Sequence, residues 1–179
     1  MAMKEIPPPA EKLTLVEPTL ELESAFLEMA QECREHGEPG FNDALRNFKS
    51  YVRLRQAHAL GKELPAGRVP GTSYWLVRND KDIVATASLR HELNEHLEKE
   101  GGHIGYNVRP SERRKGYGTR LLAMVLDKAR GRGMTRVLVT CDTDNIASAK
   151  IIRANGGKLE NEVISDFTGK VKSRYWIDL

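Results

Sequence analysis

The stretch from Val108 to Thr119 reads Val-Arg-Pro-Ser-Glu-Arg-Arg-Lys-Gly-Tyr-Gly-Thr, and it decides the fold of this chain. An alternating apolar segment, His103 to Val108, precedes it, and an amphipathic segment opens near Gly118. This order indicates a strand, a basic loop that contains glycines, and the N-terminus of a helix. Because unpaired backbone N–H groups and the positive end of a helix dipole meet at such a junction, its natural guest is a phosphorylated cofactor.

The residue types in this loop suit an anion. Gly116 and Gly118 let the backbone approach a bulky group closely. Three consecutive cations precede them: Arg113, Arg114 and Lys115. Two other phosphate loops do not fit, because no Gly-Lys-[Ser/Thr] follows and Leu121 stands where a dinucleotide fingerprint needs its third small residue. The loop alone leaves open a plain turn with a solvated basic face.

Length and charge set the class of protein. The chain has 179 residues, a net charge of +3 and 30% charged residues. This length fits one domain, expected over residues 12–179 after a flexible leader of residues 1–11. The charge is too balanced for a nucleic-acid-binding composition, and no apolar run approaches the ~20 residues that span a bilayer. We therefore expect no nucleic acid and no membrane as partners, and, without a signal-peptide core, a cytoplasmic location.

The two cysteines, Cys33 and Cys141, are expected to be reduced thiols. The sequence has no Cys-x-x-Cys and no His-x-x-x-His, so it predicts no metal site. Cys141 ends an apolar strand, where a cysteine is more often inert packing than a nucleophile.

Hydrophobic periodicity predicts the order strand, two helices, three strands, helix, strand, helix, two strands. The expected strands are residues 13–16, 74–77, 83–89, 104–108, 137–141, 158–164 and 172–177. The expected helices are residues 19–36, 43–60, 118–131 and 145–154. Such an order predicts an α/β fold of the mixed α+β kind, in which helices flank a mostly antiparallel mixed sheet of six to seven strands.

These residues also resemble a known family. The run Arg113–Gly118 resembles the (Arg/Gln)-x-x-Gly-x-(Gly/Ala) signature of the GNAT superfamily of N-acetyltransferases. The preceding Val108-x-Pro110, Asn145 and the later Asn155-Gly156-Gly157 also stand at that family's places. The resemblance covers the chain well from Trp75 onward and the two N-terminal helices more loosely. Around residues 90–95 and 101–106 the chain looks like a branch of predicted acetyltransferases without an established substrate.

The resemblance implies how acetyl-CoA, the expected co-substrate, would bind. The strand ending at Val108 would splay from the strand at residues 137–141, and the pantetheine arm would enter the slot between them. This arm would pair with backbone near Tyr106 and Val108, and Asn145 would bond to it with Ser148 nearby. Without the resemblance, Asn145 is equally well explained as an ordinary helix N-cap. The diphosphate would contact the loop: Arg113, Arg114, Lys115, Gly116, Tyr117, Gly118 and Thr119.

The implied reaction moves an acetyl group from the thioester directly to a primary amine. An alkylamine has a pKa near ~10.4, so at pH 7 almost all of it is a non-nucleophilic ammonium, and a proton acceptor is needed. Four side chains are candidates: His91, Glu92, Glu95 and His103. We favour Glu92, because a carboxylate at the mouth of the slot attracts the ammonium, and partial burial would strengthen it as a base. Each candidate is also explained by a solvated charged loop, or by a satisfied histidine at the end of a strand.

Two further roles follow from this reaction. The developing oxyanion needs a donor, for which the backbone N–H of Tyr106 or Val108 fits. The leaving thiolate needs an acid, but Ile152 stands where many family members carry a tyrosine. A thiol near pKa ~8.5 leaves tolerably at neutral pH, so Ser148, Tyr106 or water remain candidates for the acid.

Two other interpretations compete with an enzyme: a non-catalytic acyl-CoA sensor on the same fold, and a nucleic-acid module that uses the cations of residues 109–115. The amine acceptor is not readable from the sequence, and small molecules and peptides both remain open. Phe41, Tyr74, Trp75 and the loop at residues 61–72 are candidates for the acceptor pocket, with core packing favoured for Trp75. Assembly into a homodimer is also left open.

Overall fold

Seven strands form two antiparallel sheets in the computed structural model, which describes residues 11–179. The first sheet has the order β1 (Leu13–Val16), β2 (Gly71–Arg78), β3 (Asp82–Arg90) and β4 (Ile104–Val108). The second has the order β5 (Arg136–Asp142), β7 (Val171–Asp178) and β6 (Lys158–Ile164). This arrangement confirms the expected fold class and number of strands, with the sheet divided between β4 and β5.

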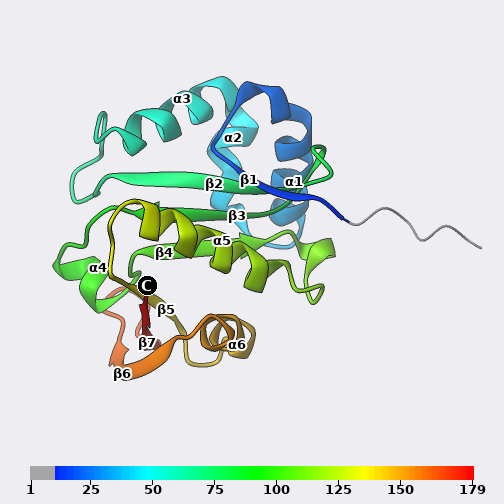
Figure 1. The fold of residues 1–179 in the computed structure, drawn as a ribbon. Helices are drawn as coiled ribbons and strands as arrows, with labels where there is room; N and C mark the ends of the chain where they lie inside the picture. Colours follow the sequence, from blue (N-terminus) through cyan, green and yellow to red (C-terminus); the bar gives the residue numbers. More distant parts are fainter. Residues whose placement is uncertain (1–10) are drawn as a thin grey trace, which may run out of the picture.

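Helices cover both faces of the first sheet (Figure 1). They are α1 (Glu23–Glu35), α2 (Asn42–Arg46), α3 (Phe48–Ala59), α4 (Glu95–Lys99), α5 (Tyr117–Gly131) and α6 (Ile146–Ala154), with 3-10 turns at Leu20–Leu22, Pro39–Phe41 and Pro110–Glu112. Side chains alternate along β2, so Trp75 packs in a core with α1 and α3, whereas Tyr74 and Leu76 pack in a second core with α5. The sheet is therefore buried on both sides.

The second expected helix is wrong as a single element. The chain breaks at Asn47, which is extended (φ −156°, ψ 91°) and whose side chain accepts a hydrogen bond from the Ser50 N–H at 2.9 Å. Asparagine is among the best N-cap residues, so it ends α2 and starts α3. The first expected helix is delayed in the same way, because Thr19 caps a 3-10 turn and α1 begins at Glu23.

Most of the expected leader lies outside the described residues, which begin at Glu11. Glu11 itself is tied to the body of the protein, because its carboxylate accepts hydrogen bonds from the Tyr117 hydroxyl and from Arg120, the latter at 3.0 Å.

His103 and Leu138 form the closest backbone joint between the two sheets within residues 11–179. The His103 N–H donates to the Leu138 carbonyl at 2.7 Å, and the Leu138 N–H donates to His103 Nδ1 at 2.9 Å. Gly102 permits this approach, since a Cβ there would lie 2.4 Å from the Leu138 carbonyl oxygen. No other backbone–backbone hydrogen bond links β4 with β5 within residues 11–179, so the strands separate beyond this joint.

The separation leaves one edge of β4 unpaired. Residues 103, 105, 107 and 109 bond to β3, as the contacts of His103 with Arg90 and of Arg109 with Val84 show at the two ends. In an antiparallel ladder the alternate residues point their N–H and C=O groups the other way. The backbone of Tyr106 and Val108 therefore faces the gap between the sheets.

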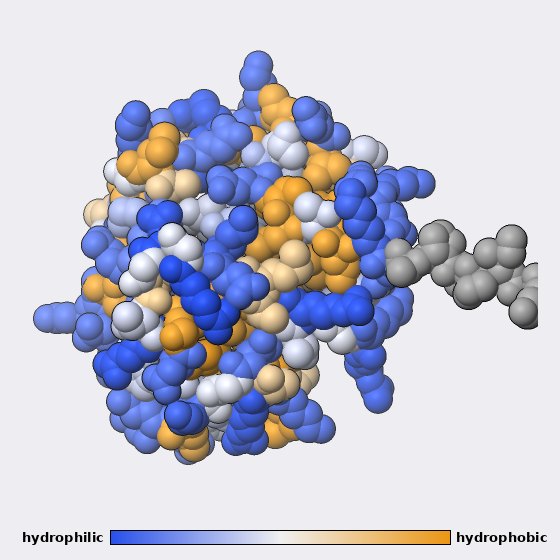
Figure 2. Space-filling model, viewed as in Figure 1, coloured by the Kyte–Doolittle hydropathy of each residue, from blue (hydrophilic) through white to orange (hydrophobic). Residues whose placement is uncertain are grey.

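Charged and polar side chains cover most of the face in Figure 2, and apolar surface forms separate patches, the broadest of them near its middle. Among the described residues no helix is both long and apolar enough to cross a bilayer.

Candidate active site

A cavity of about 920 Å³ fills the gap between the sheets. Its walls come from β4, the β4–α5 loop, the end of β5 and the first turns of α6. Of the residues expected to contact the cofactor, all line this slot except Lys115, and Tyr106 lines it too. The fold thus brings together predicted cofactor residues that lie up to 40 positions apart, from Val108 to Ser148.

The floor of the slot at its wide end is a row of backbone N–H groups. The amides of residues 114–119 have no hydrogen-bond partner among the described residues, and the first intrahelical bond of α5 runs from the Arg120 N–H to the Gly116 carbonyl. Arg114 and Gly116 have positive φ values of 64° and 84°. Because residues with positive φ alternate here with residues of negative φ, successive N–H groups converge and form an anion-binding nest. This geometry fits a diphosphate.

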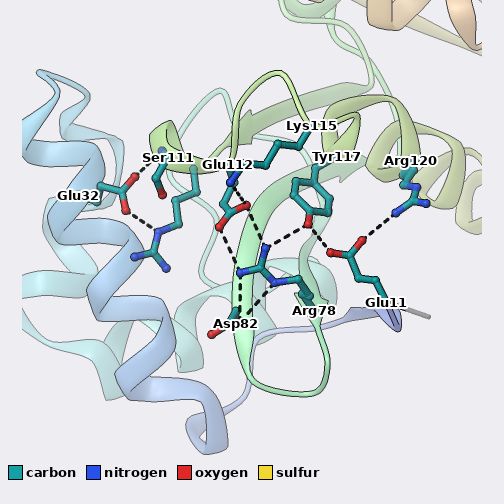
Figure 3. Close-up of polar contacts among 10 residues, drawn as sticks. Glu11, Glu32, Arg78, Asp82, Ser111, Glu112, Lys115, Tyr117 and Arg120 are labelled. Carbon is teal, nitrogen blue, oxygen red and sulfur yellow. Dashed lines mark hydrogen bonds and ion pairs between the residues drawn. The ribbon is translucent and has the colours of Figure 1, made fainter. Parts of the chain in front are cut away.

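Buried ion pairs hold this loop from beneath (Figure 3). Glu112 is 9% exposed, and its carboxylate accepts hydrogen bonds from both terminal nitrogens of Arg78 and, at 2.9 Å, from Lys115. Arg78 also donates to the Tyr117 hydroxyl at 3.1 Å and to Asp82. These partners lower the pKa of Glu112 although burial opposes them. These ion pairs therefore preorganise the loop, and the negative charge of Glu112 is balanced by Arg78 and Lys115.

A second anchor ties the same loop to α1. Glu32 accepts hydrogen bonds at 2.6 Å from Arg109 and from the Ser111 N–H, as Figure 3 shows for the Glu32–Ser111 pair. The pKa of Glu32 is lowered, because these hydrogen bonds outweigh the effect of its burial. Sequence analysis missed Glu32, Arg78 and Glu112. Only Glu112 carried a signal, as one acid inside a basic run.

Three expected cofactor residues act differently from the expectation. The Arg113 side chain does not stand free beside the loop, because its guanidinium donates to both Glu38 oxygens at 2.6 and 2.7 Å and to the Val108 carbonyl at 3.1 Å. The Tyr117 side chain is buried, and its hydroxyl accepts a hydrogen bond from Arg78. Gly118 is required by packing: a Cβ there would lie 2.6 Å from the Ile151 Cδ1 atom of α6.

Side chains from both sheets meet at the narrow part of the slot. The Tyr106 hydroxyl of β4 lies 2.7 Å from the Ser148 hydroxyl of α6. Burial raises the pKa of Tyr106 to about 12, so its hydroxyl is protonated at neutral pH. The pKa of the nearby Cys141 thiol is raised, first by burial. Asn145 caps α6 by accepting from the Ser148 N–H at 3.0 Å, which leaves its NH₂ group without a partner among the described residues.

The other three proposed catalytic side chains do not line this cavity. Glu92 is exposed, so it lacks the burial that we expected. His91 Nε2 lies 2.9 Å from the Thr72 hydroxyl, and burial, with Arg132 at the far end of α5, lowers its pKa. His103 serves the joint between the sheets, where its Nδ1 accepts a hydrogen bond and burial lowers its pKa to about 4. The local sequence did not predict these positions. His91 and Glu92 follow β3 and His103 precedes β4, so all three lie at the end of the first sheet where His103 joins Leu138.

A second cavity of about 210 Å³ adjoins the slot on the side of α1 and α3. Gly105, Tyr106 and Asn107 line both cavities. Phe41 and Trp75, two of the residues suggested for an acceptor pocket, line the smaller one, whereas Tyr74 lies in the core with α5. At the shared wall, the Asn107 side chain donates to Glu38 at 3.3 Å.

Comparisons with known proteins agree with this geometry. Residues 26–156 match the model of the Acetyltransferase (GNAT) family. No curated protein matches the chain.

Solved structures share its fold at low sequence identity. The microcin C7 self-immunity acetyltransferase MccE, in complex with acetyl-CoA and AMP, is 15% identical over 94% of this chain and 93% of that one, with a TM-score of 0.70. Mycobacterium smegmatis RimJ, in complex with CoA-disulfide, is 19% identical over 93% and 81%, with a TM-score of 0.72. A Salmonella typhimurium acetyl transferase, which modifies the N-terminal serine of ribosomal protein L7/L12, is 16% identical over 93% and 95%, with a TM-score of 0.66.

Proposed function

The chain belongs to the GNAT acetyltransferase family, and from this premise we propose that it transfers an acetyl group from acetyl-CoA directly to a primary amine. The observation that carries the proposal is the row of six partnerless amides at the wide end of a slot between two sheets. Backbone N–H groups at a helix N-terminus suit the diphosphate of this cofactor. Two solved structures of the same fold contain acetyl-CoA or a CoA disulfide.

The slot suits the rest of the cofactor as well. The outward N–H and C=O groups of Tyr106 and the outward N–H of Val108 would pair with the amides of the pantetheine arm, as an added strand does. The NH₂ group of Asn145 would donate a hydrogen bond to a pantetheine carbonyl, while its side-chain oxygen caps α6. The thioester would then lie near Tyr106, where the two cavities meet.

Tyr106 is our candidate for the acid. In the transfer, the amine nitrogen forms a bond to the carbonyl carbon and the carbon–sulfur bond breaks, so the thiolate takes up a proton. The Tyr106 hydroxyl is protonated, reaches into the slot and can be resupplied through Ser148. It thus supplies from β4 the phenol that Ile152 cannot supply from α6.

Glu38 replaces Glu92 as our candidate for the proton acceptor. It lines the slot and contacts Asn107, whose side chain belongs to both cavities. Glu38 is paired with Arg113, so a water between it and the amine would carry the proton.

The proposal extends to a cytoplasmic location and to a homodimer. A homodimer is supported by β6, which is an edge strand of the second sheet with mostly exposed side chains.

Thiol release tests the function. Wild-type protein with acetyl-CoA and a panel of amines should release coenzyme A only when an amine is present. Binding of acetyl-CoA without amine-dependent release would instead support the acyl-CoA sensor.

The diphosphate site has a matched test. Arg114 lines the slot and has no carboxylate partner among the described residues, so Arg114→Glu should weaken acetyl-CoA binding about tenfold. Acetyl-pantetheine, which lacks the diphosphate, should bind both proteins equally. Lys128→Glu makes the same charge change at the other end of α5 and should bind acetyl-CoA normally. Equal losses for both thioesters in Arg114→Glu would place the diphosphate elsewhere.

A further inference from the structure

The smaller cavity has an unusual charge for a site that receives amines. Its volume of about 210 Å³ is below the ~300–1,000 Å³ typical of pockets for drug-sized ligands, so it suits a small molecule. No aspartate or glutamate lines it. Arg55 is its one residue that is charged at neutral pH. The remaining polar wall consists of neutral groups, among them Ser73, Ser88 and Asn107.

Arg55 is held at the cavity without being neutralised. Its guanidinium carbon lies 4.8 Å from the centre of the Tyr51 ring, one helical turn away on α3. Within residues 11–179 no carboxylate lies within 4.0 Å of it. Its neighbour Arg53, by contrast, points to Glu63 at 2.6 Å and lies outside the cavity. A stacked, half-buried arginine with free donors is a ready partner for a carboxylate.

We propose that the acceptor is a small amino acid-like molecule, whose carboxylate binds Arg55 and whose amine faces the slot. This inference rests on the proposed function, since it assigns the acceptor of the same site. The amine end would lie at the wall formed by Gly105, Tyr106 and Asn107, which both cavities share. There Glu38, which contacts Asn107, offers carboxylate oxygens to the ammonium alongside its ion pair with Arg113. The two ends of the site thus match a zwitterion.

The proposal also says which acceptors are poor. An amine without a carboxylate leaves the Arg55 charge unpaired in a partly desolvated cavity, and a polyamine adds a second positive charge beside it. In the reaction the ammonium of the amino acid loses two protons, one to solvent before the attack and one as the amide forms. Its nitrogen bonds to the acetyl carbon, the carbon–sulfur bond breaks, and the thiolate of coenzyme A takes up the second proton. The carboxylate takes no part in bond changes, so its effect belongs to binding.

Paired acceptors test this directly. We would measure kcat and KM with phenylalanine against phenethylamine, leucine against isoamylamine, and lysine against cadaverine, at saturating acetyl-CoA. Wild-type protein should prefer the carboxylate-bearing member of at least one pair about tenfold or more in kcat/KM. Arg55→Gln should abolish that preference through KM, while its acetyl-CoA affinity stays unchanged. Arg53→Gln, on the same helix, should behave as wild type.

The outcomes separate this inference from the function beneath it. Amine-dependent thiol release with no preference for carboxylates, or with the same loss in Arg55→Gln for both members of a pair, overturns the inference and leaves the acetyltransferase intact. The inference is also overturned if the protein binds acetyl-CoA but acetylates no amino acid in the panel. Acetylation of peptides alone counts as this outcome. Failure to bind acetyl-CoA removes both.

Discussion

At the scale of single residues, Tyr106 carries more of the chemistry than its place in the sequence suggests. Its backbone faces the slot, the residue lines both cavities, and its hydroxyl contacts Ser148 on a helix 42 positions later. Burial keeps the hydroxyl protonated by raising its pKa to about 12. Such a phenol can donate a hydrogen bond to the thiolate as the carbon–sulfur bond breaks, although its raised pKa makes it a weaker acid than a thiol near ~8.5.

Tyr106→Phe keeps the ring and removes the proton. We expect kcat to fall about 10- to 100-fold, at the low end of general acid catalysis, because a thiolate leaves tolerably without help. Acetyl-CoA binding, measured by calorimetry, should stay within about twofold. Ser148→Ala leaves the phenol in place and should reduce kcat less. A Tyr106→Phe enzyme with wild-type kcat would assign the proton to water.

At the scale of elements, the α5–α6 contact sets the width of the slot. Gly118 in the first turn of α5 faces Ile151 of α6 and Val108 of β4. A Cβ atom at position 118 would lie 2.6 Å from Ile151 Cδ1 and 3.4 Å from Val108 Cγ2. The second glycine of the phosphate loop thus serves helix packing, while Gly116, with φ 84° and open space around it, serves the turn. One loop motif therefore combines two physical requirements.

A double-mutant cycle measures this contact. Gly118→Ala should lower the free energy of unfolding by about 1–2 kcal/mol, because its methyl group overlaps Ile151 Cδ1. Ile151→Val removes that carbon, so the alanine should cost less in the Ile151→Val background, with a coupling of at least about 0.5 kcal/mol in urea denaturation. Strictly additive effects would mean that α6 does not restrict Gly118.

At the scale of the whole molecule, the backbone joint between the two sheets depends on an uncharged histidine. His103 Nδ1 can accept the Leu138 N–H only while that nitrogen carries no proton. Burial, and then the charges of Arg90 and Arg136, lower the pKa of His103 to about 4. The histidine that we considered as a base therefore holds the closed end of the slot.

This assignment predicts how stability depends on pH. The pKa of His103 is about 4 in the folded protein and ordinarily 6.5, so between these pH values the unfolded chain binds more protons. The free energy of unfolding should fall as the pH drops from about 6.5 toward about 4, by at most on the order of 3 kcal/mol. His103→Gln retains an acceptor without a proton equilibrium, so it should flatten this part of the curve. Parallel curves for the two proteins would exclude the role.

The sequence alone determined the strand, loop and helix around Val108–Thr119, because these elements follow from local periodicity and from residue types within one stretch. It also placed Asn145, Ser148 and Tyr106 along one slot, through the family resemblance, and the structure has all three lining the same cavity. Boundaries failed where a single side chain decided them, as at Asn47.

Only the tertiary structure decided which charges meet. Glu112 finds Arg78 34 positions away, Arg113 finds Glu38 75 positions away, and Arg55 is left without a carboxylate among the described residues. Local sequence carries no information on such partners, since they are chosen by how the sheets and helices pack. For the same reason Glu92, a reasonable base by its neighbours in the chain, lies exposed outside the slot.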